Sequence, residues 1–244
     1  MCVNIKNMLS KICNLSPEQY VVSKQIKQLS EMNLIRLNSK LKKFKYIFVA
    51  DNPGENEISS NKPRCKVEYL SNGNTKTNFD NFITNFLGLS GSVDVLILNK
   101  SLIGTKTTEE LRTKIKDGDD SQALIADLAA EMLEKYGDLT LVLMGWTDYF
   151  DVDDEGIFSR FYKELSQKIS ECPDIEMRIC AYPHPSRRQL LTRTEQKVIE
   201  ENGYTSKDQK EDIFKQYGHL QFNNRKPKDT VVGFIEQYKK TMGR

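Results

Sequence analysis

Four short apolar runs stand out in the hydrophobic pattern of this chain, and each is followed by polar or turn-forming residues. Aliphatic and aromatic side chains that favour β-strands fill these runs. They span residues 45–50, 93–98, 139–144 and 176–182. Short apolar runs bounded by turn signals are typical of strands that are buried on both faces of a sheet. The pattern therefore predicts four buried strands.

Segments with the periodicity of amphipathic helices lie between and beyond these strands. We expect helices at residues 79–87, at 121–136, at 158–170 and at 230–241, and one that opens at 107–110. Ahead of the first strand, Ser16 and Pro17 have the pattern of an N-cap and a first helical residue, which predicts a helix running toward Leu29. Residues 55–77 are polar and irregular, so we expect no regular element there.

The alternation of strands and helices makes repeated βα units, which predict a mainly parallel sheet covered by helices on both faces. This is a three-layer α/β/α sandwich. We expect one domain over residues 1–244, with a core at about 45–190 and helical extensions at 1–44 and 191–244. Ligands of such sheets bind beyond the carboxyl ends of the strands. The residues that follow each strand are therefore the candidates for chemistry.

Polar side chains occupy these strand ends. Asp51 and Asn52 open the turn after the first strand, Asn99 closes the second, and His184 follows the fourth between two prolines. The prolines restrict the backbone, so the imidazole has a fixed direction. An amide offers both a donor and an acceptor, which suits the edge of a nucleobase. Each of these residues also has a structural interpretation, as a turn residue, a strand cap or a loop histidine with satisfied hydrogen bonds.

Composition and charge narrow the class of protein. The apolar runs are too short to span a bilayer, the first residues lack the pattern of a secretory signal, and the five cysteines form no metal-binding or disulfide pattern. We therefore expect a cytoplasmic monomer with no membrane segment, metal or other cofactor. Residues 1–46 carry nine lysines and arginines against two acids, and residues 187–244 carry thirteen against eight. These basic flanks either hold a polyanion or keep surface helices soluble.

The order of the strand-end motifs resembles the uracil-DNA glycosylase superfamily. Its members carry a Gly-x-Asp/Asn-Pro-Tyr/Gly turn after the first strand and His-Pro-Ser after the last. This chain has Ala-Asp-Asn-Pro-Gly at residues 50–54 and His-Pro-Ser at 184–186. Leu-Ile-Leu-Asn at 96–99 is similar to the Leu-Leu-Leu-Asn end of the intervening strand in the best-known family. The resemblance covers about residues 45–190.

The chain departs from the superfamily pattern at several positions. Ala50 replaces the first glycine of the opening motif, and Asn52 stands where the most active family has Asp, as it does in the mismatch-specific branches. After Ser186 the chain has Arg187 and Arg188, where the family often has a Pro-Leu pair whose leucine wedges into the space left by the flipped base. The cysteines do not match the iron–sulphur families. These departures concern the preferred base more than the fold.

The resemblance implies a hydrolase of DNA repair, an N-glycosylase that excises uracil or another deaminated or damaged base from single- or double-stranded DNA. In this role His184 would donate to the departing base oxygen, and Asn99 would bind the base edge. Asn52 would orient the attacking water. Because an amide cannot accept a proton, we expect slow chemistry unless Asp51 or Glu55 shares that task.

Further residues have roles implied by the same resemblance or by their charge. Tyr69 resembles the aromatic residue on which the base stacks. Ser186, Arg187 and Arg188 are suited to phosphates, the serine by a hydrogen bond and the arginines by charge and fork geometry. The second histidine, His219, lies in a charged helical segment, and we expect it to be structural.

Two other functions stay open at this point. One is a catalytically weak or inactive member that binds nucleic acid or a nucleotide, which the acidic middle of the chain and the missing catalytic Asp favour. The other is a hydrolase or transferase that acts on a free nucleoside. The surface around His184 separates them. A basic groove through Lys100, Arg187 and Arg188 favours a polymer, whereas a closed acidic pocket favours a small molecule.

Overall fold

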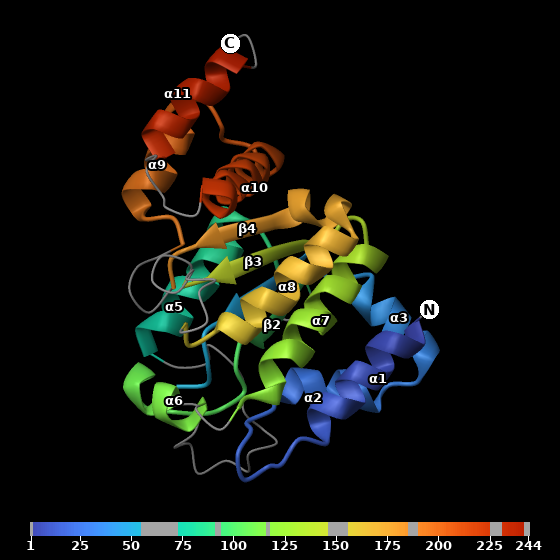
Figure 1. Cartoon of the computed structure of the whole chain (residues 1–244). Coiled ribbons are helices and arrows are strands. Elements are labelled where there is room, and N and C mark those ends of the chain that lie inside the picture. The colour runs from blue at the N-terminus through green and yellow to red at the C-terminus, as the bar shows by residue number, and fades with distance from the viewer. Residues whose placement is uncertain are drawn as a thin grey trace.

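A parallel sheet of four strands forms the centre of the computed structural model, which describes residues 2–54, 73–90, 94–115, 118–145, 156–184, 190–224 and 231–241 (Figure 1). The strands are β1 (Tyr46–Ala50), β2 (Val95–Asn99), β3 (Thr140–Met144) and β4 (Ile179–Tyr182). They lie in the order β2-β1-β3-β4, and every neighbouring pair is parallel. The predicted parallel sheet is confirmed.

The strand order creates a change of direction in the chain between β1 and β3. From β1 the chain passes to β2 on one side, and it then crosses back to β3 on the other side. The register is regular, with Ala50 opposite Asn99 in β2 and Tyr46 opposite Thr140 in β3. In open sheets of this kind the carboxyl ends of the two strands beside such a switch point border a crevice. The turns after β1 and β3 lie at that position here.

One face of the sheet is covered by helices from the first part and the middle of the chain. They are α1 (Cys2–Cys13), α2 (Lys24–Glu31), α3 (Leu34–Leu41), α7 (Asp120–Lys135) and α8 (Ser159–Glu171), and α6 (Thr108–Lys114) adds Leu111 to the same cluster. Their apolar side chains pack on alternate residues of the strands, such as Ile47 and Val49 of β1. The helices of residues 1–44 therefore share this hydrophobic core with the sheet.

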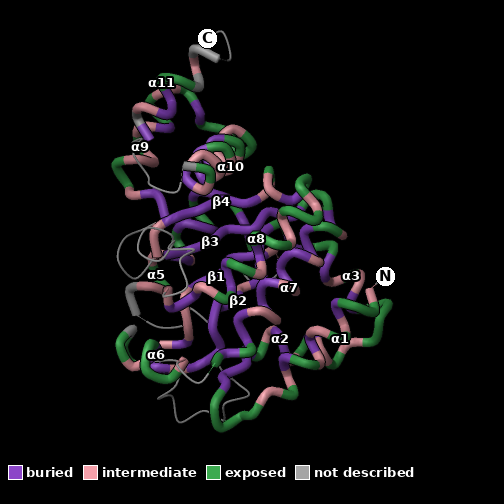
Figure 2. Tube along the Cα trace, in the orientation of Figure 1, coloured by how far each residue is buried: buried purple, intermediate pink, exposed green. Residues whose placement is uncertain are grey.

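The other face is covered by α5 (Gly73–Asn81), the π-helix η2 (Phe82–Phe86), α9 (Arg193–Glu201), α10 (Lys207–Asn224) and α11 (Val231–Thr241). Tyr182 of β4 stacks on Phe214 of α10 with ring centroids 4.5 Å apart, and its hydroxyl donates to the Phe214 carbonyl at 2.6 Å. With helices on both faces the molecule is a three-layer α/β/α sandwich, and every residue of the four strands except Ile97 is buried (Figure 2).

Two sequence predictions of local structure are wrong. No helix begins at Ser16, because the backbone of Tyr20 forms a bridge with Ile103, and extended pairing is incompatible with a helix. The helix α2 instead begins at Lys24, where the Ser23 side chain caps it. The segment 73–77, which we expected to be irregular, belongs to α5.

The start of the fourth strand also differs from the prediction. Residues 176–178 belong to a 3-10 helix, η6 (Pro173–Arg178), and β4 begins only at Ile179. A proline at the first helical position favours this turn, and Ile175 is buried within it. The helices expected at 107–110, 121–136, 158–170 and 230–241 are present within one or two residues. No helix in the described ranges has the length and apolar character needed to cross a bilayer.

Candidate functional site

The residues that follow β1 and β2 form a buried ion pair. Lys100 Nζ lies 2.6 Å from Asp51 Oδ1 and also donates to the Met144 carbonyl at 2.6 Å. The Lys100 side chain is 0% exposed, and that of Asp51 is 24% exposed. Parallel register explains the pairing, since Ala50 lies opposite Asn99 and the next residue of each strand must therefore be adjacent. Lys100 is thus not part of a basic surface groove.

Two aromatic rings, one at the N-cap of α8 and one within that helix, lie close to the buried ammonium group. Lys100 Nζ stands 5.0 Å from the ring centroid of Phe158 and 5.6 Å from that of Tyr162. Burial favours the neutral amine, but the attraction of Asp51 and of the Tyr162 phenol outweighs it and raises the pKa of Lys100. Lys100 is therefore a cation at neutral pH. Because removing an ion pair from water costs several kcal/mol, such a pair at the strand ends is a candidate for function.

The turn after β3 makes room for the carboxylate of this pair. Gly145 has φ +79°, and a Cβ there would fall 2.6 Å from Asp51 Oδ1 and 3.0 Å from Oδ2. Its N–H donates to the Tyr182 carbonyl at 2.9 Å. Only glycine satisfies both the left-handed backbone and the missing space. The Asp51 carboxylate consequently lies against the β3 turn, at the switch point of the sheet.

His184 joins this group from the end of β4. It follows the strand by two residues and is half-buried. Burial lowers the pKa of His184, the negative charge of Asp51 opposes this, and the positive charge of Lys100 reinforces it, so that the pKa lies below its ordinary value. The imidazole is therefore neutral at neutral pH. His184 and Asp51, which the sequence predicted to share a site, lie in one electrostatic neighbourhood.

Asn52 has a structural role that the sequence did not reveal. Its Nδ2 group donates to the carbonyls of Pro53 at 3.2 Å and Ile103 at 3.3 Å, and to Thr105 Oγ1 at 3.0 Å. The Thr105 N–H returns a hydrogen bond to the Pro53 carbonyl at 3.1 Å. The Asn52 amide thus ties the β1 turn to the loop after β2. Because the amide is planar, its Oδ1 points away from these three acceptors.

Asn99, the last residue of β2, carries a buried donor. Its side chain is 1% exposed, and its Nδ2 has no hydrogen-bond partner in the described part of the chain. A buried polar group left in this state costs about 1–3 kcal/mol. The side chain lies on the same face of the sheet as its pairing partner Ala50. Asn52 and His184 each follow a residue of that face, Ala50 and Tyr182, by two positions.

Several predicted site residues cannot be placed. They are Glu55, Tyr69, Ser186, Arg187 and Arg188, which lie outside the described residues, so their roles stay predictions. His219 is placed, and its contacts within the fold agree with the structural role that we expect for it. Its Nδ1 lies 3.2 Å from the Ile179 carbonyl and its Nε2 lies 3.0 Å from Asn223 Nδ2.

Sequence reasoning missed the partnership of Lys100 with Asp51 and the need for Gly145. One signal was present, because a lysine directly after one apolar strand and an aspartate directly after its parallel neighbour become adjacent in register. The order of the strands in the sheet was needed to use that signal. It was not predictable from the runs alone.

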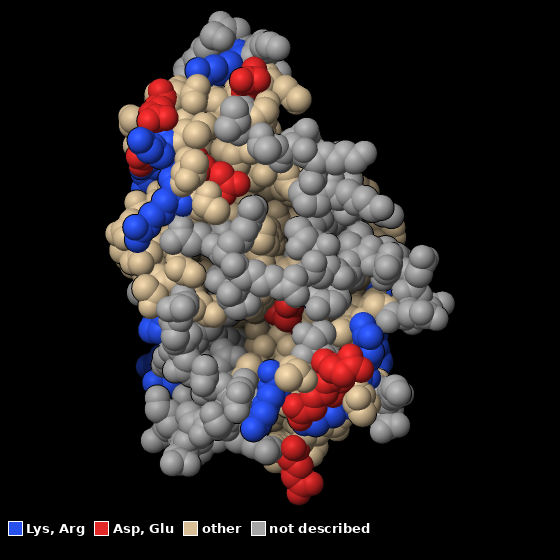
Figure 3. All heavy atoms as spheres, turned by 90° about the vertical axis from the view of Figure 1, so that its left-hand side faces the viewer, with Lys and Arg blue, Asp and Glu red and all other residues tan. Residues whose placement is uncertain are grey.

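Figure 3 shows the side of the molecule at the carboxyl ends of the strands, toward which the arrows point in Figure 1. On the described part of this face, lysines and arginines are scattered among acids toward the upper and lower ends of the view, and they form no continuous basic groove. The expected alternative of a basic track across this face therefore has no support from the described residues.

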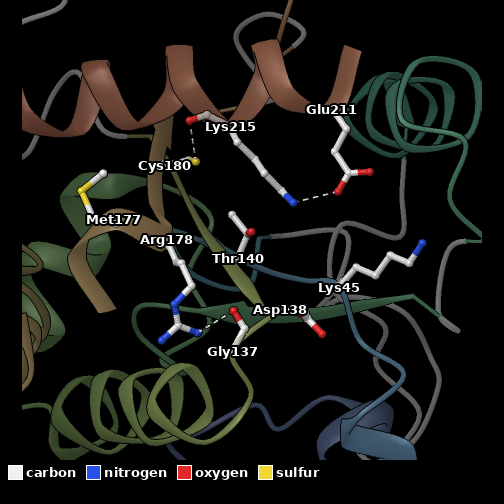
Figure 4. A pocket seen from close by; sticks show the side chains of 9 residues that line it. All are labelled: Lys45, Gly137, Asp138, Thr140, Met177, Arg178, Cys180, Glu211 and Lys215. Carbon is white, nitrogen blue, oxygen red and sulfur yellow. Dashed lines mark hydrogen bonds and ion pairs between the residues drawn. The ribbon is translucent and has the colours of Figure 1, made fainter. Parts of the chain in front are cut away.

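A pocket of about 470 Å³ opens at the opposite edge, beside the amino ends of β1, β3 and β4 (Figure 4). Its charged lining groups are largely paired. Lys215 Nζ lies 2.8 Å from Glu211 Oε1, and Arg178 Nη1 donates to the carbonyls of Tyr136 at 2.9 Å and Gly137 at 3.3 Å. None of the candidate residues at the strand carboxyl ends lines this pocket. We therefore place the candidate site at the carboxyl ends of the strands, beside Asp51.

Comparison with known proteins gives no relative from which a role could be transferred. No protein-family model, curated protein or solved structure matches this chain. The function is accordingly inferred from the strand-end residues and their geometry.

Proposed function

We propose that this chain is a DNA N-glycosylase that hydrolyses the bond between a flipped base, uracil or another deaminated or damaged base, and its sugar. The buried Nδ2 group of Asn99 carries this proposal, because no described residue accepts its hydrogen bonds. A carbonyl oxygen on the edge of a base is an acceptor of the required kind. Asp51 directly follows β1 and His184 lies two residues after β4, at the strand ends where the reacting groups would lie.

Hydrolysis of the bond between the base and the sugar balances in atoms and charge. The enzyme first takes the base out of the helix, at a cost of a few kcal/mol. The bond from C1′ of the sugar to the base nitrogen then breaks, and its electron pair leaves with the base. A water oxygen bonds to C1′, one proton of the water ends on the base, and the other stays in the new hydroxyl. The transition state carries positive charge on the sugar and negative charge on the base.

His184 suits the negative end of this transition state. The lowered pKa of His184 keeps the imidazole neutral near pH 7, so its N–H can donate to the base oxygen where charge develops. The proline before it holds the ring in a limited range of directions. A donor of this kind is typically worth about 100- to 1000-fold in rate.

The proposal is tested by release of the free base from a panel of oligonucleotides containing uracil, hypoxanthine, xanthine or mismatches, as single and double strands. We expect the parent to release at least one of these bases. His184→Ala should lower the single-turnover rate by about 100- to 1000-fold, and His219→Ala, which removes the other histidine, should not. Asn99→Asp should abolish release, since a carboxylate would repel the base carbonyl. Release from no substrate in the panel would refute the proposal.

A nucleic-acid or nucleotide-binding module without cleavage is the second candidate, and one observation favours it. The Asn52 amide, which stands where the most active family has a carboxylate, is engaged in tying the β1 turn to Ile103 and Thr105. This candidate predicts that the parent binds uracil-containing DNA, or a free nucleotide, and releases no base. Equilibrium binding measured beside the release assay separates the two functions.

A further inference from the structure

The ion pair between Lys100 and Asp51 differs from a surface salt bridge because its cation is completely buried. Lys100 Nζ is held by Asp51 Oδ1 and the Met144 carbonyl, each at 2.6 Å, and the side chain is 0% exposed. The cation cannot turn toward solvent, so its position is set by the fold rather than by its own rotamers. Lys100 thereby fixes the carboxylate oxygen with which it pairs.

The carboxylate itself is partly exposed to solvent. The Asp51 side chain is 24% exposed, and its backbone is anchored because the Ser101 N–H donates to the Asp51 carbonyl at 3.1 Å. Gly145 adds no side chain, so this residue does not displace the carboxylate. An anion held in this way is preorganised, and it needs no reorganisation when a positive charge appears beside it.

The Asp51 carboxylate can supply the negative charge that the neutral Asn52 amide lacks. A sugar that becomes cationic is stabilised by a negative charge, and the Asn52 amide is neutral and occupied by Pro53, Ile103 and Thr105. Asp51 is the adjacent residue and carries the missing charge. Its interaction with His184 shows that its field reaches the group proposed to face the base.

We propose that Lys100 is a positioning residue that holds the Asp51 carboxylate as a fixed anion facing the sugar, in place of the carboxylate that Asn52 lacks. The role rests on the proposed glycosylase function. Asp51 acts through its charge, and Lys100 acts through Asp51. The pair sits at the switch point between β1 and β3, where the crevice of such a sheet lies.

The same geometry excludes Lys100 as a nucleophile. Attack on C1′ would need a neutral amine that reaches the sugar, and this ammonium is buried and bonded to Asp51 and the Met144 carbonyl. Lys100 therefore forms no imine with C1′ of the sugar. Any complex that borohydride traps between the protein and DNA should form equally in Lys100→Met and in the parent.

The test compares Lys100→Met, Asp51→Asn and the double variant in the full chain. Each single change leaves one buried charge without its partner, so we expect a lower melting temperature in both. The double variant replaces the pair by neutral groups of similar volume and should recover most of that loss. Its single-turnover rate should stay about 100- to 1000-fold below the parent, with little change in DNA affinity.

A matched control separates this role from the general effect of losing a lysine. Lys210 Nζ of α10 also forms an ion pair at 2.6 Å, with Glu200 of α9, and stands 5.6 Å from the Phe86 ring centroid. Its side chain is 15% exposed. Lys210→Met should keep the parent rate.

The pH–rate profile gives a readout that a merely structural role would not move. Asp51, from the β1 turn, raises the pKa of His184, and Lys100, from the end of β2, lowers it. The acidic limb, where His184 becomes protonated, should therefore move to higher pH in Lys100→Met and to lower pH in Asp51→Asn. If the parent releases a base and the folded double variant does so at the same rate, the positioning role is overturned alone. If the parent releases none, the proposed function fails and this role falls with it.

Discussion

The carboxylate of Asp51 occupies the space in which a side chain of Gly145 would lie, with Oδ1 2.6 Å from the ideal Cβ position. This contact joins the turns after β1 and β3 across the switch point of the sheet. It makes Gly145 a sensitive probe of the site, because any larger residue must displace the anion.

Gly145→Ala should be destabilising for two reasons. The left-handed backbone at φ +79° costs about 1–2 kcal/mol for a residue with a Cβ, and the methyl group collides with Asp51. Gly203→Ala is the matched control, because φ is +88° there and nothing lies within 4 Å of the added Cβ. Urea denaturation should show a larger loss at Gly145. Equal losses would mean that the Asp51 contact adds no strain.

Gly218→Ala should loosen the packing of α10 on β4. An added Cβ would fall 2.5 Å from Tyr182 Cε2 and 2.7 Å from Cys180 Cβ, so the helix must shift away from the strand. Overpacking of this kind costs about 1–3 kcal/mol in the free energy of unfolding. Gly137→Ala, with nothing within 4 Å of its Cβ, should change stability much less. A Gly218→Ala protein as stable as the parent would show that α10 repacks freely.

The histidine of the site should make stability depend on pH. Burial lowers the pKa of His184 in the folded state, so the unfolded chain binds more protons once the pH falls below about 6.5. The free energy of unfolding should therefore decrease as the pH falls from about 6.5 toward the lower, folded pKa. His184→Gln should flatten this part of the profile, measured by urea denaturation, and His219→Gln should leave the contribution of His184 in place. A profile unchanged in His184→Gln would contradict the prediction.

Arg187 and Arg188 should act in binding rather than in chemistry. Arginines that meet phosphates contribute equally before and during the reaction, so replacing each by Ala should weaken DNA binding and reduce the salt slope of binding by roughly one counterion. The single-turnover rate at saturating DNA should not change. The measurement is DNA affinity over a series of salt concentrations. A salt slope that stays at the parent value would show that these side chains meet no phosphate.

Much of the fold was predictable from local pattern. The four apolar runs became four strands because a run without polar positions can be buried on both faces only inside a layered sheet. Helix starts with a side-chain cap were also predictable, as at Thr107, where the hydroxyl accepts from the Glu110 N–H. The local signal at Ser16 failed because pairing of Tyr20 with Ile103, 83 positions apart in the chain, outweighed it.

The candidate site also has a part that the sequence predicted and a part that only the tertiary structure decided. The sequence by itself determined that Asp51, Asn99 and His184 stand at strand ends, because each lies within two residues of the end of an apolar run. Only the tertiary structure decided what surrounds them. A lysine in a sequence is expected at the surface. Lys100 is buried because strand order and register place Asp51 beside it, and because the rings of Phe158 and Tyr162 cover it. Such a charge is stable only when its partner is supplied by a distant segment, which no local pattern encodes.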